Sequence, residues 1–205
     1  MRRPRLYLAS ASPRRDELLR QIGLAPRRVL ARVEERWIDG ESAVSHVARL
    51  AEAKARAAAL RLESVAEPGL ILAADTAVVI DGEPLGKPRN PDHAREMLRR
   101  LRGREHEVLT GVFLLRTDAT ASHAAVESTR VRFYDFGDAT LSAYVAGGEP
   151  RDKAGAYGIQ GRGALLVERI EGSWSNVVGL PVERLPVWAL RVGIDLVELI
   201  DWQTR

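Results

Sequence analysis

Apolar residues along this chain fall into short runs, separated by stretches in which they recur every three or four positions. A run at 5–9 predicts a buried strand, and the spacing over 13–22 predicts a helix that Gly23 ends. Another strand is expected near 27–33. From about 42 to 62, apolar residues recur at helical spacing with arginines between them, which predicts a long helix.

In the middle of the chain, residues 70–74 and 76–80 form one apolar run. It ends in Asp-Gly at 81–82, a pair typical of a hairpin turn. Asn90, followed by proline, predicts the start of a helix that reaches Leu101. This region therefore predicts a hairpin followed by a helix.

The last part of the chain again mixes both periodicities. Strands are expected at about 106–116 and 122–135, a short helix over 138–146, a strand over 164–170 and a final helix near 182–192. Because strands and helices alternate only in part, the pattern predicts an α/β fold whose sheet is mixed rather than wholly parallel.

The composition is that of a globular protein with a core, since 45% of the 205 residues are hydrophobic and 29% are charged. With no repeat or obvious linker, residues 1–205 are predicted to form one domain. No apolar run approaches the roughly 20 residues of a membrane-spanning helix, and the first apolar stretch is too short for a signal peptide. The chain has no cysteine, which excludes disulfides and cysteine nucleophiles. We expect a cytoplasmic protein that binds no membrane.

The charged residues narrow the choice of ligand. Net charge is +3, with 31 basic and 28 acidic residues mixed along the chain, so nucleic acid is not an expected partner. The only lysines are Lys54, Lys87 and Lys153; every other basic residue is arginine. This preference suggests that lysine is kept where a compact ammonium is needed.

The first candidate site joins the first strand to the first helix, at Ser10 to Arg15. Ser12 is the expected N-cap and Pro13 the first helical residue. The free N–H groups and the dipole of a helix start favour an anion, whereas Arg14 and Arg15 oppose that dipole. The arrangement predicts an anionic ligand; a capped helix with solvated arginines is the alternative.

The second candidate is Asp75, which ends an apolar run where a carboxylate is costly to bury without a partner. There it could hold a metal or take a proton from water, and Thr76 offers a hydroxyl beside it. A structural aspartate that accepts backbone hydrogen bonds is equally compatible with the sequence.

Two further segments could reach phosphates or metal. GEPLGKP at 82–88 can deliver Lys87 to a phosphate, but it is not a Walker A loop, because three residues separate its glycines and proline follows the lysine. The pair Glu34-Glu35 precedes the helix that carries Lys54. Such paired carboxylates are solvated unless a metal binds them.

The segment GAYGIQGRG at 155–163 is rich in glycine but lacks the dinucleotide-binding order of glycines. It is either a flexible loop or a loop that reads a nucleobase, with Gln160 hydrogen-bonded to the base edge.

These segments together resemble the Maf family of septum-formation-inhibitor-like nucleotide pyrophosphatases, over nearly the whole chain. The matching segments are, in order, LYLASASPRRDELL, VARLAEAKA, AADTAVV, GKP, HEVLTGV, STRVRF and GEPRDKAGAYGIQGRGALLVERIEGSWSNVVGLP. All three lysines lie within them.

The resemblance implies hydrolysis of a nucleoside triphosphate to the monophosphate and pyrophosphate, with Asp75 as general base. It links Arg14, Thr76 and Gln160 to substrate choice. Asp75-Thr76 together with Ile159-Gln160-Gly161 is similar to the subgroup that acts on dTTP and UTP. The implied fold is a twisted mixed sheet with flanking helices, in two lobes around a central cleft, as in inosine-triphosphatase-like proteins. A homodimer is expected.

The chemistry needs bound phosphates, an aligned water and a divalent metal. The residues expected to bind substrate are Ser10, Arg14, Arg15, Lys54, Thr76, Lys87 and Gln160. Asp75 and Glu35 are expected to hold Mg²⁺ or Mn²⁺, hard cations that favour oxygen ligands. Asp75 would also position or deprotonate the attacking water.

Two other functions remain compatible with the sequence. A pyrophosphatase for modified pyrimidine nucleotides would differ only in its base pocket. A regulatory protein of cell division could bind a nucleotide or nucleic acid without hydrolysing it. Asp75, Lys54 and Lys87 argue against that binder, because binding alone does not need a buried carboxylate beside phosphates.

Overall fold

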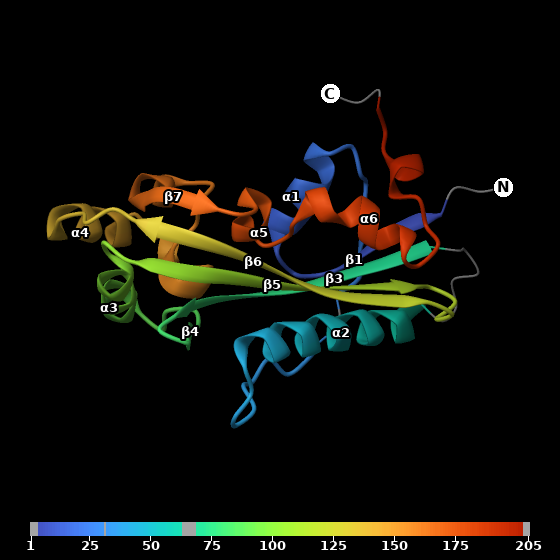
Figure 1. Cartoon of the computed structure of the whole chain (residues 1–205), viewed down its shortest axis with the longest axis horizontal. Helices are drawn as coiled ribbons and strands as arrows, with labels where there is room; N and C mark the ends of the chain where they lie inside the picture. Colours follow the sequence, from blue (N-terminus) through green and yellow to red (C-terminus); the bar gives the residue numbers. More distant parts are fainter. Residues whose placement is uncertain (1–3, 31, 63–68, 203–205) are drawn as a thin grey trace. The chain divides into compact units, whose positions relative to one another are not determined.

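The computed structural model describes residues 4–30, 32–62 and 69–202 (Figure 1). Its strands are β1 (Arg5–Ala9), β2 (Arg27–Arg28), β3 (Gly69–Ile80), β4 (Glu83–Leu85), β5 (Glu105–Arg116), β6 (Ser122–Phe133) and β7 (Val167–Glu171). Its α-helices are α1 (Pro13–Gln21), α2 (Ala43–Leu62), α3 (Pro91–Leu101), α4 (Asp138–Ala146), α5 (Trp174–Val178) and α6 (Leu185–Leu190). Within these ranges no helix has the length and hydropathy that crossing a membrane requires.

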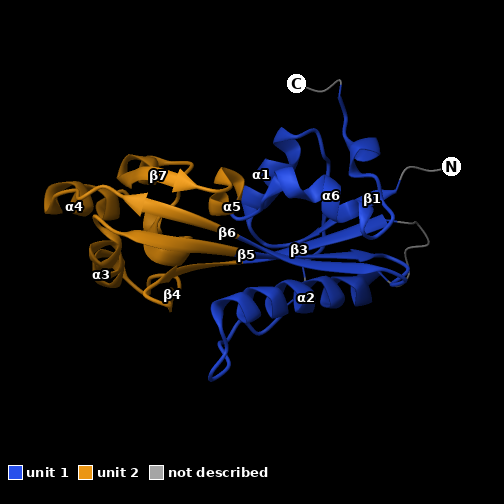
Figure 2. Cartoon of the chain, in the orientation of Figure 1, with its two compact units in different colours: residues 1–75, 110–127, 179–205 blue, residues 76–109, 128–178 orange. Residues whose placement is uncertain are grey.

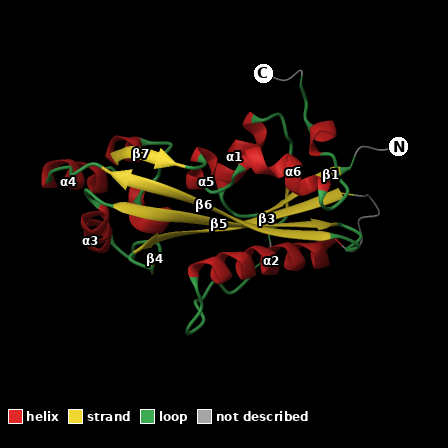
Figure 3. Ribbon diagram, viewed as in Figure 1, coloured by secondary structure: helices red, strands yellow, loops and turns green. Residues whose placement is uncertain are grey.

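The strands form one sheet in the order β2-β1-β3-β5-β6-β7, and β4 pairs with β3 (Figure 3). β1 runs parallel to β2 and to β3, with Leu6 opposite Leu70 and Leu8 opposite Leu72. β4 is antiparallel to β3, and β7 is antiparallel to β6. The sheet is therefore mixed and flanked by helices, which confirms the α/β class.

The chain is divided into two compact units (Figure 2). Unit 1 is 1–75, 110–127 and 179–205, and unit 2 is 76–109 and 128–178. The division falls within β3, β5 and β6, so each of these strands contributes residues to both units. The single domain over 1–205 and the central cleft stay predictions.

In unit 1, α2 packs on one face of the strands, and Figure 1 shows α1 and α6 on the opposite face. The helix face against the sheet is mostly alanine, with Ala51 and Ala55 among the fully buried residues beside Tyr7 and Phe113. Small side chains let the helix backbone approach the sheet closely. The backbones are close together at Gly111 of β5, where a Cβ atom would lie 2.3 Å from a carbonyl oxygen of α2.

In unit 2, α3 and α4 pack on a separate core that contains Leu98, Phe133 and Tyr157. His106 of β5 is buried there and makes a hydrogen bond from its Nε2 side to the Tyr157 hydroxyl at 2.8 Å. Burial lowers the pKa of His106 to about 3, so the ring is neutral at physiological pH. This histidine stabilises the core and has no place in the candidate chemistry.

Local sequence signals predict most elements correctly. The hairpin at 81–82 is confirmed, with Asp81 at φ 55° and Gly82 at φ 77°, as a two-residue turn with both positions left-handed requires. The helix start at Asn90 is also confirmed, because the Asn90 side chain accepts a hydrogen bond from the His93 N–H at 2.8 Å.

The strand expected near 27–33 is wrong beyond Arg28. The Val29 N–H still donates to the Leu8 carbonyl at 3.0 Å, but Leu30 is exposed, and Ala31 lies outside the described residues. β2 is the last strand in the sheet order, so no second neighbour prolongs it.

Two later boundaries also differ. The strand expected at 164–170 starts only at Val167, because Arg162–Leu166 form a 3₁₀-helix, η3. The helix expected near 182–192 is restricted to Leu185–Leu190, after a separate 3₁₀ turn, η4 (Val182–Arg184). Proline lies in the first turn of α6, where its missing N–H is tolerated, and it marks the start of that helix.

Candidate active site

The centre of the candidate site is one ammonium group between two carboxylates, all in unit 1. Lys54 Nζ lies 2.7 Å from Asp75 Oδ1 and 2.5 Å from Glu35 Oε1. The Lys54 and Asp75 side chains are each 13% exposed, whereas the Glu35 side chain is 51% exposed. The structure therefore brings together three residues that lie far apart in the sequence and for which the sequence predicts contacts with metal and phosphate.

The fold explains this meeting. Asp75 follows the buried alanines 73–74 of β3, at the point where the strand becomes less buried. Lys54 lies on α2, and the next residue of that helix, Ala55, packs against the sheet. Since α2 packs on the face of β3 in unit 1, its lysine reaches the aspartate across the helix–sheet interface.

A second group lies where β1 meets α1. Arg15 is buried, and its guanidinium donates to the Gly179 carbonyl at 2.8 Å and to Ser10 Oγ at 2.9 Å. Burial lowers the pKa of Arg15, while the charges of Asp75 and Glu35 act in the opposite direction. Arg15 is thus fixed by two hydrogen bonds, and it lies close enough to Asp75 and Glu35 for their charges to act on its pKa.

The start of α1 has no side-chain cap. Ser12 is the N-cap, as predicted, but its side chain makes no capping hydrogen bond. Its N–H instead donates to Ser10 Oγ at 3.2 Å. Arg14, next along the first turn, is half-buried. The geometry agrees with an anion site at this helix start, and the roles of Ser10, Arg14 and Arg15 toward substrate stay predictions.

Glu35 lies on an irregular segment that precedes α2, and a polar clasp fixes this segment. We call Glu41, His46 and Arg49 the clasp. Arg49 binds both carboxylate oxygens of Glu41 at 2.6 and 2.8 Å and also donates to the Arg36 carbonyl at 3.1 Å. His46 Nδ1 lies 2.9 Å from Glu41 Oε2. Because Arg36 follows Glu35 directly, the clasp restrains the backbone beside the candidate ligand.

The clasp gives a prediction for stability against pH. Hydrogen bonds from Arg49, with a further one from His46, hold the pKa of Glu41 at about 2, below its ordinary value of 4.5. The unfolded chain therefore binds a proton at higher pH than the folded chain does. The contribution of Glu41 is complete above pH 4.5 and decreases as the pH falls toward 2.

We expect Glu41→Gln to lower the free energy of unfolding at neutral pH and to flatten its decrease between pH 4.5 and 2. Urea denaturation at a series of pH values measures both effects. Glu52→Gln is the matched control. Glu52 lies in α2, the helix that carries His46 and Arg49, and it pairs with Arg56 on the exposed side of that helix. Equal pH profiles for Glu41→Gln and the wild type would refute this role of the clasp.

The other predicted residues lie in unit 2. Thr76 follows Asp75 in β3 and is half-buried, whereas Lys87 and Gln160 are exposed on loops. These two loops are linked, because the Gly155 N–H donates to the Gly86 carbonyl at 3.1 Å. Their assignment to phosphate and base stays a prediction.

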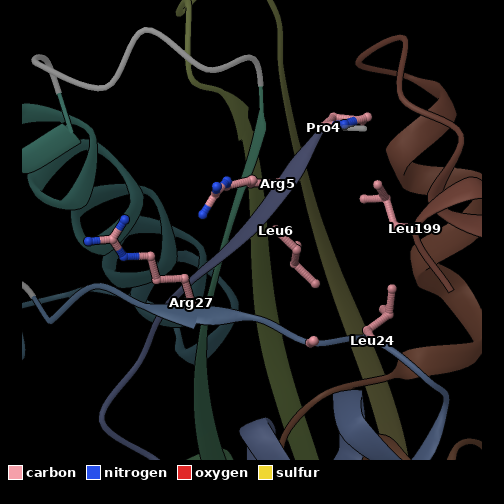
Figure 4. A pocket seen from close by; sticks show the side chains of 7 residues that line it. Pro4, Arg5, Leu6, Leu24, Arg27 and Leu199 are labelled. Carbon is pink, nitrogen blue, oxygen red and sulfur yellow. The ribbon is translucent and has the colours of Figure 1, made fainter. Parts of the chain in front are cut away.

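A pocket of about 290 Å³ lies elsewhere, at the start of β1 (Figure 4). Leu6, Leu24 and Leu199 line it together with Arg5 and Arg27. Ligand sites of open α/β sheets lie at the carboxyl ends of parallel strands, and this pocket is at the amino end of β1. None of the predicted site residues lines it.

The donor set suits a hard divalent cation. Both carboxylates lie within hydrogen-bonding distance of one ammonium, and carboxylate oxygens are the ligands that a hard divalent cation favours. In the part of the chain that the structure describes, no three His, Cys, Asp or Glu side chains gather as a metal site. Two protein carboxylates, completed by phosphate and water, are the usual arrangement for Mg²⁺.

Nothing in the sequence pattern indicates the roles of Glu41, Arg49 or Glu149. Glu149 accepts backbone hydrogen bonds from Arg162 and Gly163, at the end of the glycine-rich segment that contains Gln160. Arg49 and Glu149 both lie inside segments that resemble the Maf family, but nothing in their spacing indicates their partners.

Comparison with known proteins gives a consistent result. The family model described as "Maf-like protein" matches residues 5–188. A protein of Anaeromyxobacter dehalogenans named "dTTP/UTP pyrophosphatase" is 51% identical over 197 residues, which are 94% of this chain and 96% of that protein. Proteins with the same name from Symbiobacterium thermophilum and Methylobacillus flagellatus are 50% and 48% identical, over 87% of this chain and 89% and 87% of theirs.

Among solved structures, the chain is similar to a nucleoside-triphosphatase/dITP/XTP pyrophosphatase of Mycobacterium abscessus. The TM-score is 0.35 at 11% identity, with 64% of this chain and 74% of that chain covered. A likeness this low has no bearing on the function of the chain.

Proposed function

The chain belongs to the Maf family, as its sequence segments predicted, and on that premise we propose that it hydrolyses dTTP and UTP to the monophosphates and pyrophosphate. It is then a hydrolase of acid anhydrides. The observation that best supports this assignment is the placement of Lys54 between Asp75 and Glu35, since it supplies both a cation for phosphate and carboxylates for metal and water.

The triphosphate is bound by cations around the start of α1 and by Lys54 and Lys87. The Arg15 guanidinium has a fixed orientation, because it donates hydrogen bonds to the Gly179 carbonyl and to Ser10 Oγ. Arg14 and Lys54 add charge in the same unit, and Lys87 is the further cation that the sequence predicts for the phosphates. Such groups neutralise phosphate charge and orient the chain of phosphates for attack.

Asp75 and Glu35 would hold the divalent metal. When bound, Mg²⁺ or Mn²⁺ supplies a Lewis acid that neutralises developing charge and lowers the pKa of water. Asp75 accepts the proton of the attacking water as the oxygen–α-phosphorus bond forms. The bond from the α-phosphorus to the bridging oxygen breaks, and its electron pair leaves with pyrophosphate.

Products and the site of attack test this mechanism together. We expect UTP to give UMP and pyrophosphate, and in water enriched in heavy oxygen we expect the label in UMP. Label in pyrophosphate would place the attack on the β-phosphorus. UDP and orthophosphate as products would refute the proposal.

Base recognition is assigned to Gln160, whose exposed amide can pair with the edge of a pyrimidine. We expect Gln160→Ala to lower the ratio of kcat/KM for UTP to that for CTP on the order of fivefold, the effect of one neutral hydrogen bond. Steady-state kinetics with both nucleotides measure the ratio. An unchanged ratio would remove Gln160 from base recognition.

The cytoplasm, where nucleoside triphosphates are made and used, is the location that this function requires. A homodimer, and activity on modified pyrimidine nucleotides, stay predictions.

A further inference from the structure

The glycine-rich segment 155–163 is fixed by one carboxylate outside it. Glu149 Oε2 accepts a hydrogen bond from the Arg162 N–H at 2.8 Å, and Oε1 accepts one from the Gly163 N–H at 3.2 Å. These are the first two residues of η3. The carboxylate therefore holds the backbone just after the turn that contains Gln160.

Tyr144 of α4 connects Glu149 to Gly158, the residue before the turn 159–161. Its hydroxyl donates to Glu149 Oε1 at 3.1 Å and accepts from the Gly158 N–H at 3.2 Å. Burial, reinforced by the charge of Glu149, raises the pKa of Tyr144, so the phenol keeps the proton that it donates. Both ends of the turn 159–161 are thus connected to the same carboxylate.

Two glycines of the segment lie directly against the side chains that hold it. A Cβ atom at Gly161 would lie 2.7 Å from Glu149 Oε2, and one at Gly158 would lie 2.6 Å from Lys153 Cε. Lys153 in turn donates to the Glu149 backbone carbonyl at 2.7 Å. The segment is therefore packed around Glu149 and Lys153, which favours a defined loop over the flexible loop that the sequence alone allowed.

We propose that Glu149 is a positioning residue for base selectivity: without touching the nucleotide, it fixes the turn that presents Gln160. The inference rests on the proposed function and on the role of Gln160 in it. It makes the carboxylate of Glu149 a determinant of the choice between pyrimidines, through the backbone of Gly158, Arg162 and Gly163.

The test is a double-mutant cycle with Glu149→Gln and Gln160→Ala, read as the UTP to CTP ratio of kcat/KM. These nucleotides differ along one edge of the base, which carries a carbonyl and a ring N–H in uracil and an amino group and an unprotonated ring nitrogen in cytosine. Glu149→Gln keeps the shape but turns an amide NH₂ toward a backbone N–H, so the turn loses an acceptor. We expect it to lower the ratio about fivefold, and we expect the double variant to match Gln160→Ala alone.

Glu168→Gln is the matched control, since Glu168 is an exposed residue of unit 2 that pairs with Arg132. It should leave the ratio unchanged. Should Glu149→Gln fail to fold by circular dichroism, Tyr144→Phe takes its place, since it removes only the hydroxyl that connects Gly158 to Glu149. We expect a smaller decrease in the same direction.

The outcomes distinguish the proposed function from the role of Glu149. A wild-type protein that releases no pyrophosphate would refute the proposed function. With an active wild type, a ratio that falls in Gln160→Ala but not in Glu149→Gln or Tyr144→Phe would overturn the role of Glu149 alone. Additive effects in the double variant would overturn it too, because two independent residues would then act on the base.

Discussion

We expect Asp75→Asn to lose at least about 2–3 orders of magnitude in turnover while the protein stays folded, in line with the loss of a general base. Asparagine has nearly the same shape as aspartate, so it fits at position 75 of β3 beside Lys54. It cannot accept the proton of the attacking water, and it is a weaker ligand for a divalent cation. The Lys54 ammonium also loses one of its two carboxylate partners.

Turnover with UTP, beside circular dichroism to check the fold, measures the effect. Asp81→Asn is the matched control in the same hairpin. Asp81 is exposed, pairs with Arg104 and has φ 55°, a conformation that asparagine also tolerates. We expect normal turnover from this control. Near-normal turnover in Asp75→Asn would remove Asp75 from the mechanism.

The second large effect is expected for Gly111→Ala. A Cβ atom there would lie 2.3 Å from the Val47 oxygen, 2.4 Å from the Val47 carbonyl carbon and 2.8 Å from the Ala48 nitrogen. All three are backbone atoms of α2, so no side chain can move aside. Overpacking of this kind costs about 1–3 kcal/mol of unfolding free energy, and contact with backbone rather than with a movable side chain places Gly111 at the upper end of that range.

Urea denaturation compares Gly111→Ala with Gly86→Ala, a position where a Cβ atom would meet nothing within 4 Å. Because α2 carries Lys54, we also expect lower turnover from Gly111→Ala. The primary measure is the loss of unfolding free energy in this variant. Equal stability of the two variants would mean that α2 does not approach β5 as the structure has it.

Sequence predicted the parts of the fold that depend on local signals. Asn90 caps its own helix, and Asp81-Gly82 form their own turn, so neither needs distant partners. The end of β2 and the start of β7 depend on distant groups, and both were misplaced. In η3, the Glu149 carboxylate stabilises a 3₁₀ turn where the apolar pattern favoured a strand.

The candidate site was predictable to a similar extent. Asp75 was conspicuous as a carboxylate at the end of an apolar run, and Lys54 as a rare lysine in an arginine-rich chain. Their contact with Glu35 requires α2 to pack on the sheet, which no local signal indicates. The residues that position the site, such as Arg49 and Glu149, act on backbone groups, and side-chain patterns do not report those contacts.

The most direct test of the central claim is pyrophosphate release from a panel of nucleoside triphosphates, with Mg²⁺ or Mn²⁺ and with a chelator control. The account predicts metal-dependent release that is strongest with dTTP and UTP. Release from no canonical or modified nucleotide, whatever metal is added, would contradict it and favour a protein that binds nucleotides without hydrolysing them.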